Sequence, residues 1–292
     1  MPTLRDIRKR LKAIQNTKKI TAAMKMVAAA KLRKVQDKML NFRPYAIKMD
    51  SVLSDLAKGT EREIHPLLAM RPRKTVEVIV LTSDRGLCGA FNTNILRASA
   101  KHIDSLKKEG VEISLSTVGR KARDYFRRRN VTIRKSWTGL SGKVSYLPAQ
   151  EIAGELIESY KNETIDEVIL IYNEFKSLIH QKVSFMKLLP VGSLEPAEGQ
   201  AKEPLTSGDL LFEPSKDVIF ETLLPKHIEI QVYRGILESQ AAEEAARMAA
   251  MENATKNCGE LIDKVTLLAN KVRQAGITKE LMDIVGGVEA LK

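Results

Sequence analysis

A glycine-studded loop is the first stretch of this chain whose residue types could do chemistry. Residues 83–94 read SDRGLCGAFNTN, between an expected strand and an expected helix, which is where many α/β proteins bind phosphate. Gly86 and Gly89 give only G-x-x-G, however, and no lysine follows as in a P-loop. Asp84 also puts a negative charge where a phosphate would lie. We therefore interpret the loop as a structural turn in which Asp84 pairs with Arg85.

Other catalytic and metal-binding patterns are missing from the sequence. It has no G-x-S-x-G nucleophile motif, and its four histidines are scattered along the chain. Cys88 and Cys258 are too far apart to suggest a disulfide framework or a metal site, and we expect Cys88 to be a buried small residue. No stretch reaches the roughly 18 apolar residues of a transmembrane helix. We expect no catalytic residue, no cofactor and no metal.

The positive charge is concentrated at the start of the chain. Residues 1–34 contain eleven basic side chains against Asp6 alone, and so carry +10 of the formal net charge of +12. A solvated helix face would normally carry acidic partners four residues away, and a nucleic-acid-binding basic region would precede its zipper rather than share its length. A contact with a larger protein fits best. The segment RKARDYFRRR (120–129) is also basic, but a solvated helix face is its commoner meaning.

The first expected element is a long helix with heptad spacing, which calls for a coiled-coil partner. Its apolar frame comprises Leu4, Ile7, Leu11, Ile14, Ala28, Leu32, Val35, Met39 and Phe42. The middle of this frame is occupied by Lys18, Thr21 and Lys25. There the apolar stripe moves over by one residue, to Thr17, Ile20, Met24 and Val27. We therefore expect the helix to rotate the face that it presents.

A second long helix is expected at the end of the chain, where no proline occurs between Lys226 and Gly286. At about 1.5 Å per residue it would be longer than a compact domain is wide, so it must protrude. The most economical arrangement is an antiparallel pair with the first helix. Whether Pro225 begins or kinks this helix stays open. Its expected seam is Cys258, Leu261, Val265, Leu268, Val272 and Ala275, and a small-residue face is formed by Ala241, Ala242, Ala245, Ala246, Ala249 and Ala250.

The middle of the chain alternates expected strands and helices, which indicates an α/β layer domain. The expected strands are 76–82, 111–118, 131–137, 167–173 and 181–191, and the expected helices are 94–109, 119–129 and 148–161. Asn92 or Asn94 is a plausible cap of the first of these helices and Gly110 its stop. The predicted fold is an α/β head domain with Rossmann-like layers, inserted between two long terminal helices that form an antiparallel coiled coil. Its predicted parts are helix 1–58, head 74–192, linker 193–214 and helix 215–288.

Three motifs in this order resemble the gamma subunits of F-type ATP synthases, of the bacterial type. They are QNTKKITAAMKMVAAAKLRK near the start, TSDRGLCGAFNTN in the head, and ARMAAMENATKNCGELI with ANKVRQAGITKELMDIVGG at the end. The resemblance covers essentially the whole chain. It implies a rotor shaft without bond chemistry of its own, set in a hexamer of alpha and beta subunits and joined at its foot to the epsilon subunit and the ring of c subunits. The catalytic residues would then belong to the beta subunits.

The resemblance also implies which residues contact the beta subunits. They are Lys18, Lys19, Met24 and Lys25 on the first helix and Arg273, Gln274, Thr278 and Glu280 on the last. The region 192–214 is short and contains no cysteine, unlike the regulatory insertion of the chloroplast form. The N-terminus begins directly at the family's first helix, so we expect a peripheral protein on the cytoplasmic face of a bacterial membrane rather than an organelle precursor. A basic coiled-coil nucleic-acid-binding protein is the alternative.

Overall fold

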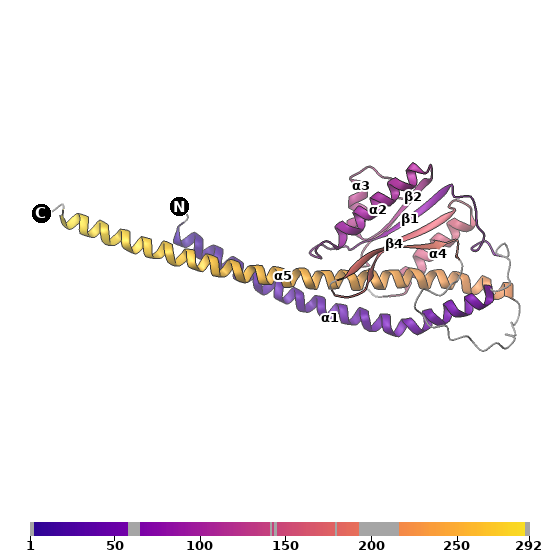
Figure 1. Cartoon of the computed structure of the whole chain (residues 1–292), viewed down its shortest axis with the longest axis horizontal. Coiled ribbons are helices and arrows are strands. Elements are labelled where there is room, and N and C mark those ends of the chain that lie inside the picture. Colours follow the sequence, from indigo (N-terminus) through magenta and orange to yellow (C-terminus); the bar gives the residue numbers. More distant parts are fainter. Residues whose placement is uncertain are drawn as a thin grey trace. The chain divides into compact units, whose positions relative to one another are not determined.

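The computed structural model describes residues 3–57, 65–140, 142, 145–178, 180–192 and 216–289 (Figure 1). The linker predicted at 193–214 lies outside these residues. Two units separate by their internal contacts: a head unit, Ala30–Ala246, and a coil unit, Met1–Ala29 with Arg247–Lys292. The two long helices, α1 (Leu4–Ala57) and α5 (Lys216–Glu289), each contribute to both units.

A five-stranded sheet forms the centre of the head unit, in the order β3-β2-β1-β4-β5. Its strands are β1 (Thr75–Leu81), β2 (Glu112–Val118), β3 (Lys135–Trp137), β4 (Glu167–Phe175) and β5 (Gln181–Leu189). The first four strands run parallel, and β5 pairs antiparallel with β4. All of β1 beyond its first residue is buried, as expected for the central strand of a sheet covered on both faces. This confirms the α/β head read from the sequence.

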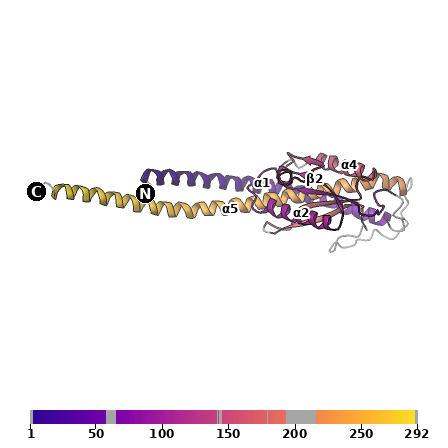
Figure 2. The same ribbon diagram turned by 90° about the horizontal axis from the view of Figure 1, so that it is seen from above.

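Helices cover the two faces of this sheet separately. The helices α2 (Phe91–Lys108) and α3 (Arg120–Arg127) pack on one face, and α4 (Leu147–Lys161) packs on the other (Figures 1 and 2). Alternate residues of β1 enter the two cores: Val78 lies with α2 and α3, and Ile79 lies with α4. The head-unit parts of α1 and α5 join the α4 side, where Leu53 and Leu237 are buried.

Two details of the head differ from the sequence expectations, and a third, which the sequence left open, is settled by the structure. The strand predicted at 131–137 is shortened to β3, because Val131 and Ile133 pack against the α2–α3 core instead of pairing. The N-cap of α2 is Ala90, without a side-chain cap, because Asn92 hydrogen-bonds to the preceding loop. Pro225 lies inside α5, so it does not begin that helix. Gly110 follows the end of α2 with a φ of 78°, as predicted for a helix stop.

The coil unit is an antiparallel pair of helix segments. Thr21 lies opposite Thr255, Lys25 opposite Glu252, and Lys18 beside Gly259, so the numbering of one helix rises as that of the other falls. The antiparallel coiled coil predicted from the two heptad patterns is thereby confirmed.

Candidate functional site

The glycine loop between β1 and α2 is held at two buried points with an exposed tip between them. Asp84 and Cys88 are 8% and 2% exposed, whereas Arg85 and Leu87 project into solvent. Leu87 has a φ of 64°, an uncommon conformation for a branched side chain, which the tight turn requires. The prediction of a turn is confirmed.

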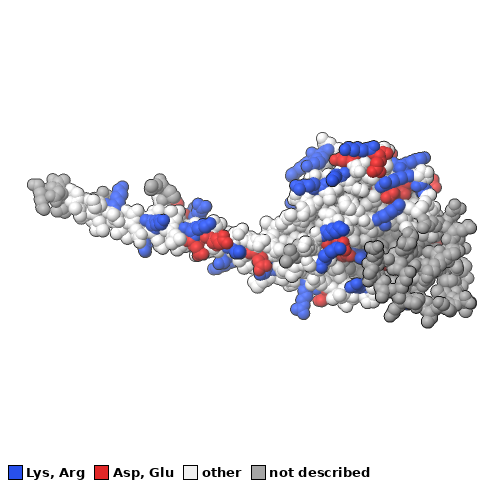
Figure 3. Space-filling view, in the orientation of Figure 1, with Lys and Arg blue, Asp and Glu red and all other residues white. Residues whose placement is uncertain are grey.

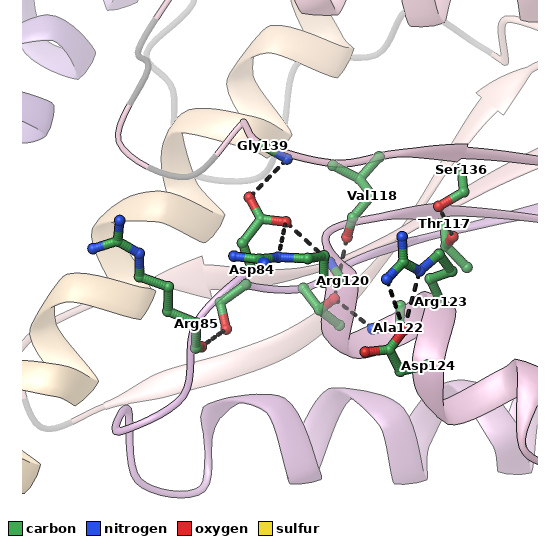
Figure 4. Close-up of polar contacts among 12 residues, drawn as sticks. Asp84, Arg85, Thr117, Val118, Arg120, Ala122, Arg123, Asp124, Ser136 and Gly139 are labelled. Atoms are coloured by element: carbon green, nitrogen blue, oxygen red, sulfur yellow. Dashed lines mark hydrogen bonds and ion pairs between the residues drawn. The ribbon is translucent and has the colours of Figure 1, made fainter.

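The carboxylate of Asp84 accepts hydrogen bonds from two distant backbone amides (Figure 4). The N–H of Arg120, at the start of α3, lies 3.1 Å from Oδ1, and the N–H of Gly139 lies 2.9 Å from Oδ2. The Nε atom of Arg120 lies 3.7 Å from Oδ1. The predicted pair of Asp84 with Arg85 is wrong: the Arg85 side chain points away from this carboxylate, which faces α3 instead. Arg120 and Gly139 could not be predicted as partners from their spacing in the sequence, because they follow β2 and β3 and are distant from Asp84 along the chain.

Backbone contacts bring the start of α3 close to the end of β1. Gly119 has a φ of 94°, and a Cβ atom built on it would lie 2.1 Å from the carbonyl oxygen of Thr82. Only glycine therefore fits at this crossing. The hydroxyl of Thr82 donates to the carbonyl oxygen of Val118 and accepts from the N–H of Ala122, at 3.1 Å and 2.9 Å. The loop, α3 and β2 are thus joined by direct hydrogen bonds.

Cys88, the second buried point of the loop, packs against the small-residue face of α5. Cys88 lies in an apolar cluster with Phe91 and Ala242, as expected for a buried small residue. Asn92 donates from Nδ2 to the Cys88 sulfur at 3.1 Å, and its Oδ1 accepts from the N–H of Ser83 at 3.1 Å. The alanines of α5 let the loop approach closely, which the sequence could not show.

The predicted contact residues on α1 lie beside a polar layer of the coil unit. The hydroxyl oxygens of Thr21 and Thr255 lie 2.8 Å apart, and Thr21 is only 8% exposed. Lys25 forms an ion pair of 2.6 Å with Glu252, in which both side chains are partly exposed. Of the four predicted contact residues on α1, Met24 and Lys25 are half-buried near this layer. Lys18 and Lys19 are exposed.

The predicted shift of the apolar stripe is wrong. Thr21 and Ala28 are buried, whereas Ile20 and Val27 are 59% and 55% exposed, so the heptad frame runs straight through the polar positions. The hydroxyl pair explains why a polar residue can occupy the seam, because each hydroxyl has a hydrogen-bonding partner there. Ile20, Val27 and Thr17 therefore lie outside the seam, on the solvent side of α1.

The second predicted group lies on an unpaired stretch of α5. Arg273, Gln274, Thr278 and Glu280 are all exposed, as is the whole described run from 273 onward. Of the seam predicted on α5, Cys258 and Val265 are buried, but Leu261 and Leu268 are 43% and 44% exposed. Large apolar side chains, including Ile277 and Leu281, project from this end, whose visible face carries few charges (Figure 3).

The two predicted groups do not meet in the coil unit. From Gly259, which faces Lys18, to Arg273 the helix rises by about 21 Å at about 1.5 Å per residue. Glu252 and Gly259, which lie against Lys25 and Lys18, and Thr255, which pairs with Thr21, were not predicted from the sequence. Continued toward the N-terminus, the predicted seam of α5 passes through Ala254 and Met251, so these three residues lie beside it and its spacing does not indicate them.

Burial shifts the pKa of several groups on and beside α5 in the head unit. Burial raises the pKa of the Glu238 carboxyl, although Arg234 donates to it at 3.0 Å. Burial also raises the pKa of Tyr172 and of Tyr146, whose hydroxyl donates to Glu229 at 2.8 Å. Within the described ranges, no cluster of three acidic, histidine or cysteine side chains is arranged to hold a metal ion. Across the same residues, no helix combines the length and the apolarity that crossing a membrane requires.

Comparison with known proteins gives consistent matches over the whole chain. The family model described as ATP synthase matches residues 3–291. The ATP synthase gamma chain of Anaeromyxobacter sp. (strain K) is 48% identical over 295 residues, and that of Pelotomaculum thermopropionicum is 47% identical over 292 residues. In both cases the match covers 100% of each chain.

Solved structures agree with these matches. A chain of the Tetrahymena thermophila mitochondrial ATP synthase central stalk and c-ring aligns with a TM-score of 0.59 and 28% identity, covering 80% of this chain and 99% of that one. A chain of the Euglena gracilis mitochondrial ATP synthase aligns with a TM-score of 0.66 over 99% of this chain and 94% of that one. At 23% identity, the Euglena likeness concerns the fold alone.

Proposed function

Because this chain belongs to the family of ATP synthase gamma chains, we propose that it is the central rotor shaft of an F-type ATP synthase. In this role it transmits torque between the proton-driven c-ring in the membrane and the hexamer of alpha and beta subunits, during ATP synthesis or hydrolysis. The observation that carries the proposal is the full-length match to gamma chains. The chain itself then makes and breaks no bond, and the catalytic sites belong to the beta subunits.

The division of the chain follows from this role. The helices 1–58 and 215–288 form the shaft, and the head 74–192 and linker 193–214 lie between them in the chain. The head meets the epsilon subunit and the c-ring, and the protein is peripheral on the cytoplasmic face of a bacterial membrane. The similarity to gamma chains of Anaeromyxobacter and Pelotomaculum supports this location.

The shaft contacts the beta subunits at two places on the coil unit. Lys18, Lys19, Met24 and Lys25 form the first, and Arg273, Gln274, Thr278 and Glu280 the second. A shaft can bias a beta subunit only by interacting unequally with its open and closed states. The ion pair of Lys25 with Glu252 suits such a contact, because a partly exposed pair contributes only about 0–1 kcal/mol and can exchange partners as the shaft turns.

Purification of the tagged chain from its native cells in mild detergent tests the assignment. We expect alpha and beta subunits in threefold excess over the tagged chain, with epsilon and c subunits present. Recovery of the chain alone, or with nucleic acid and without these subunits, would instead support the basic coiled-coil alternative. Nucleic-acid binding would then fall steeply with added salt.

Variants in the purified complex test the second contact separately. Replacing Arg273 and Gln274 together by alanine should lower ATP-driven proton transport severalfold without preventing assembly, because both side chains are exposed. Lys271→Ala is the matched control, since Lys271 is also exposed on the same stretch of α5. Equal transport by the two variants would remove these residues from the proposed contact and leave the rotor assignment untouched.

A further inference from the structure

The partners of Asp84 have the composition of an anion-binding site. They include the first N–H of α3, the guanidinium of Arg120 and the N–H of Gly139, which reach the carboxylate from two directions (Figure 4). The N-terminus of a helix carries a partial positive charge and free N–H groups, and both favour a bound anion. In this head the three donors come from the segments that follow β2 and β3.

This group lies at the carboxyl ends of the parallel strands, the end of such sheets at which ligands bind. The usual place is where the strand order reverses, which in this sheet is between β1 and β4. Asp84 follows the end of β1 by three residues, Gly119 and Arg120 follow β2 directly, and Gly139 follows β3. The carboxylate therefore lies at the carboxyl ends of the parallel strands, on the β2 side of β1 rather than at the reversal point, and it comes from the chain itself.

Burial shows that the carboxylate fills the site rather than lying at its mouth. Asp84 is 8% exposed, and a buried charge is retained only where hydrogen bonds and opposite charge compensate for its lost hydration. The cavity that adjoins it has a volume of only about 20 Å³, lined among others by Asp84, Gly119, Gln240 and Glu243. This space suits about one water molecule and excludes a phosphate group while the aspartate is present.

We propose that Asp84 is a built-in anion, which occupies an oxyanion site formed by the Arg120 N–H, the Arg120 guanidinium and the Gly139 N–H. The site's ligand class is small oxyanions, namely carboxylate, phosphate or sulfate, and the side chain keeps it permanently filled. The bound carboxylate joins the β1–α2 loop to α3 and to the segment after β3. These three segments of the head are thereby held together without a ligand from solution. This inference is independent of the proposed rotor function.

Chemical rescue of the full-length chain tests the proposal. Asp84→Gly removes a group the size of acetate, and Asp84→Asn is the matched control, since it removes the charge but leaves no room for an anion. We expect the thermal midpoint of Asp84→Gly to lie below that of the wild type and to rise by several degrees with added acetate or phosphate. The rise should saturate, as for binding at one site, and exceed that in chloride at equal ionic strength.

The wild type and Asp84→Asn should not respond to these anions beyond the effect of chloride. An equal response of all three proteins, or no response of Asp84→Gly to either anion, would overturn the proposal. If Asp84→Gly does not fold in chloride, its refolding yield from urea in acetate against chloride gives the same decision. A yield restored by acetate supports the site, and an unchanged yield contradicts it.

Discussion

The same two helices are buried very differently in the two units. In the head unit, Ile228 and Leu237 of α5 are 0% and 1% exposed, within a core that also includes the sheet and α4. In the coil unit, Leu268 and Leu281 of the same helix are 44% and 57% exposed. Both parts of α5 are helical, so they differ only in how many sides of the helix pack against other elements. The part in the head unit is fixed by packing on several sides, whereas the part in the coil unit leaves apolar side chains exposed.

The largest contrast should come from matched leucines on α5. We expect Leu237→Ala to lower the free energy of unfolding by about 2–5 kcal/mol, because it leaves a cavity in the head core. Leu268→Ala should cost less than about 1 kcal/mol, since much of that side chain is already in water. Urea unfolding of the full chain, followed by the fluorescence of the buried Trp137 and by circular dichroism, measures both. Equal costs would erase the distinction between the halves.

Two glycines of α5 sharpen the comparison at the level of the backbone. A Cβ atom on Gly235 would lie 2.6 Å from Cδ2 of Leu170 on β4, whereas one on Gly276 meets nothing within 4 Å. We expect Gly235→Ala to destabilise the head by about 1–3 kcal/mol through overpacking. Gly276→Ala should stabilise the coil helix by about 0.5–1 kcal/mol, because alanine is the better helix former. Thermal unfolding decides the signs, and a stabilising Gly235→Ala would contradict the close approach.

Acid should weaken the head selectively, since His65 and His102, whose pKa values burial lowers, both lie within Ala30–Ala246. Burial, aided by Lys161, lowers the pKa of His65 below its usual 6.5, and His65 Nδ1 accepts a hydrogen bond from the N–H of Leu67. The folded state therefore binds fewer protons than the unfolded state below about pH 6.5. Stability that is complete above that pH is lost as the pH falls toward the folded pKa.

This prediction is checked by urea midpoints between pH 7.5 and 5, about the window in which histidine titrates. His65→Asn keeps an acceptor without a titrating ring, and it should flatten the decline relative to the wild type. The exposed His180→Gln is the control and should leave the slope unchanged. If His65→Asn leaves the slope as steep, the decline has another origin.

The smallest effects belong to the polar layer of the coil. A double-mutant cycle of Thr21→Val and Thr255→Val should give a coupling of about 1 kcal/mol, the net contribution of one hydrogen bond. The same cycle on Lys25 and Glu252 should give about 0–1 kcal/mol, decreasing with added salt. A threonine coupling near zero would mean that the seam is held only by its apolar positions.

The sequence was informative where burial follows directly from residue type. The strands of the head were predicted within a few residues, except β3, because continuous apolar runs such as that of β1 can hardly lie anywhere but inside a sheet. In the coil the same reasoning failed. Ile20 and Val27 are apolar but exposed, while Thr21 occupies the seam, because its environment depends on Thr255 of the other helix.

The loop shows the same division. That it is a turn could be read from its glycines and from the missing elements of a phosphate motif. The partners of Asp84 could not, because Arg120 and Gly139 are brought to it only by the order of the strands in the sheet. Because β1, β2 and β3 pair in parallel, the segments that follow these three strands lie together at the carboxyl ends of the strands.

The unpaired end of α5 has a consequence for handling the purified chain. Arg273 and Lys279 lie in a helical run whose described side chains from 273 onward are all exposed, and such an end opens locally at little cost in free energy. Trypsin should therefore cut readily at this end of α5, and cleavage should slow markedly where Val265 is buried in the seam. The cleavage sites at successive lysines and arginines would show where α1 begins to protect α5.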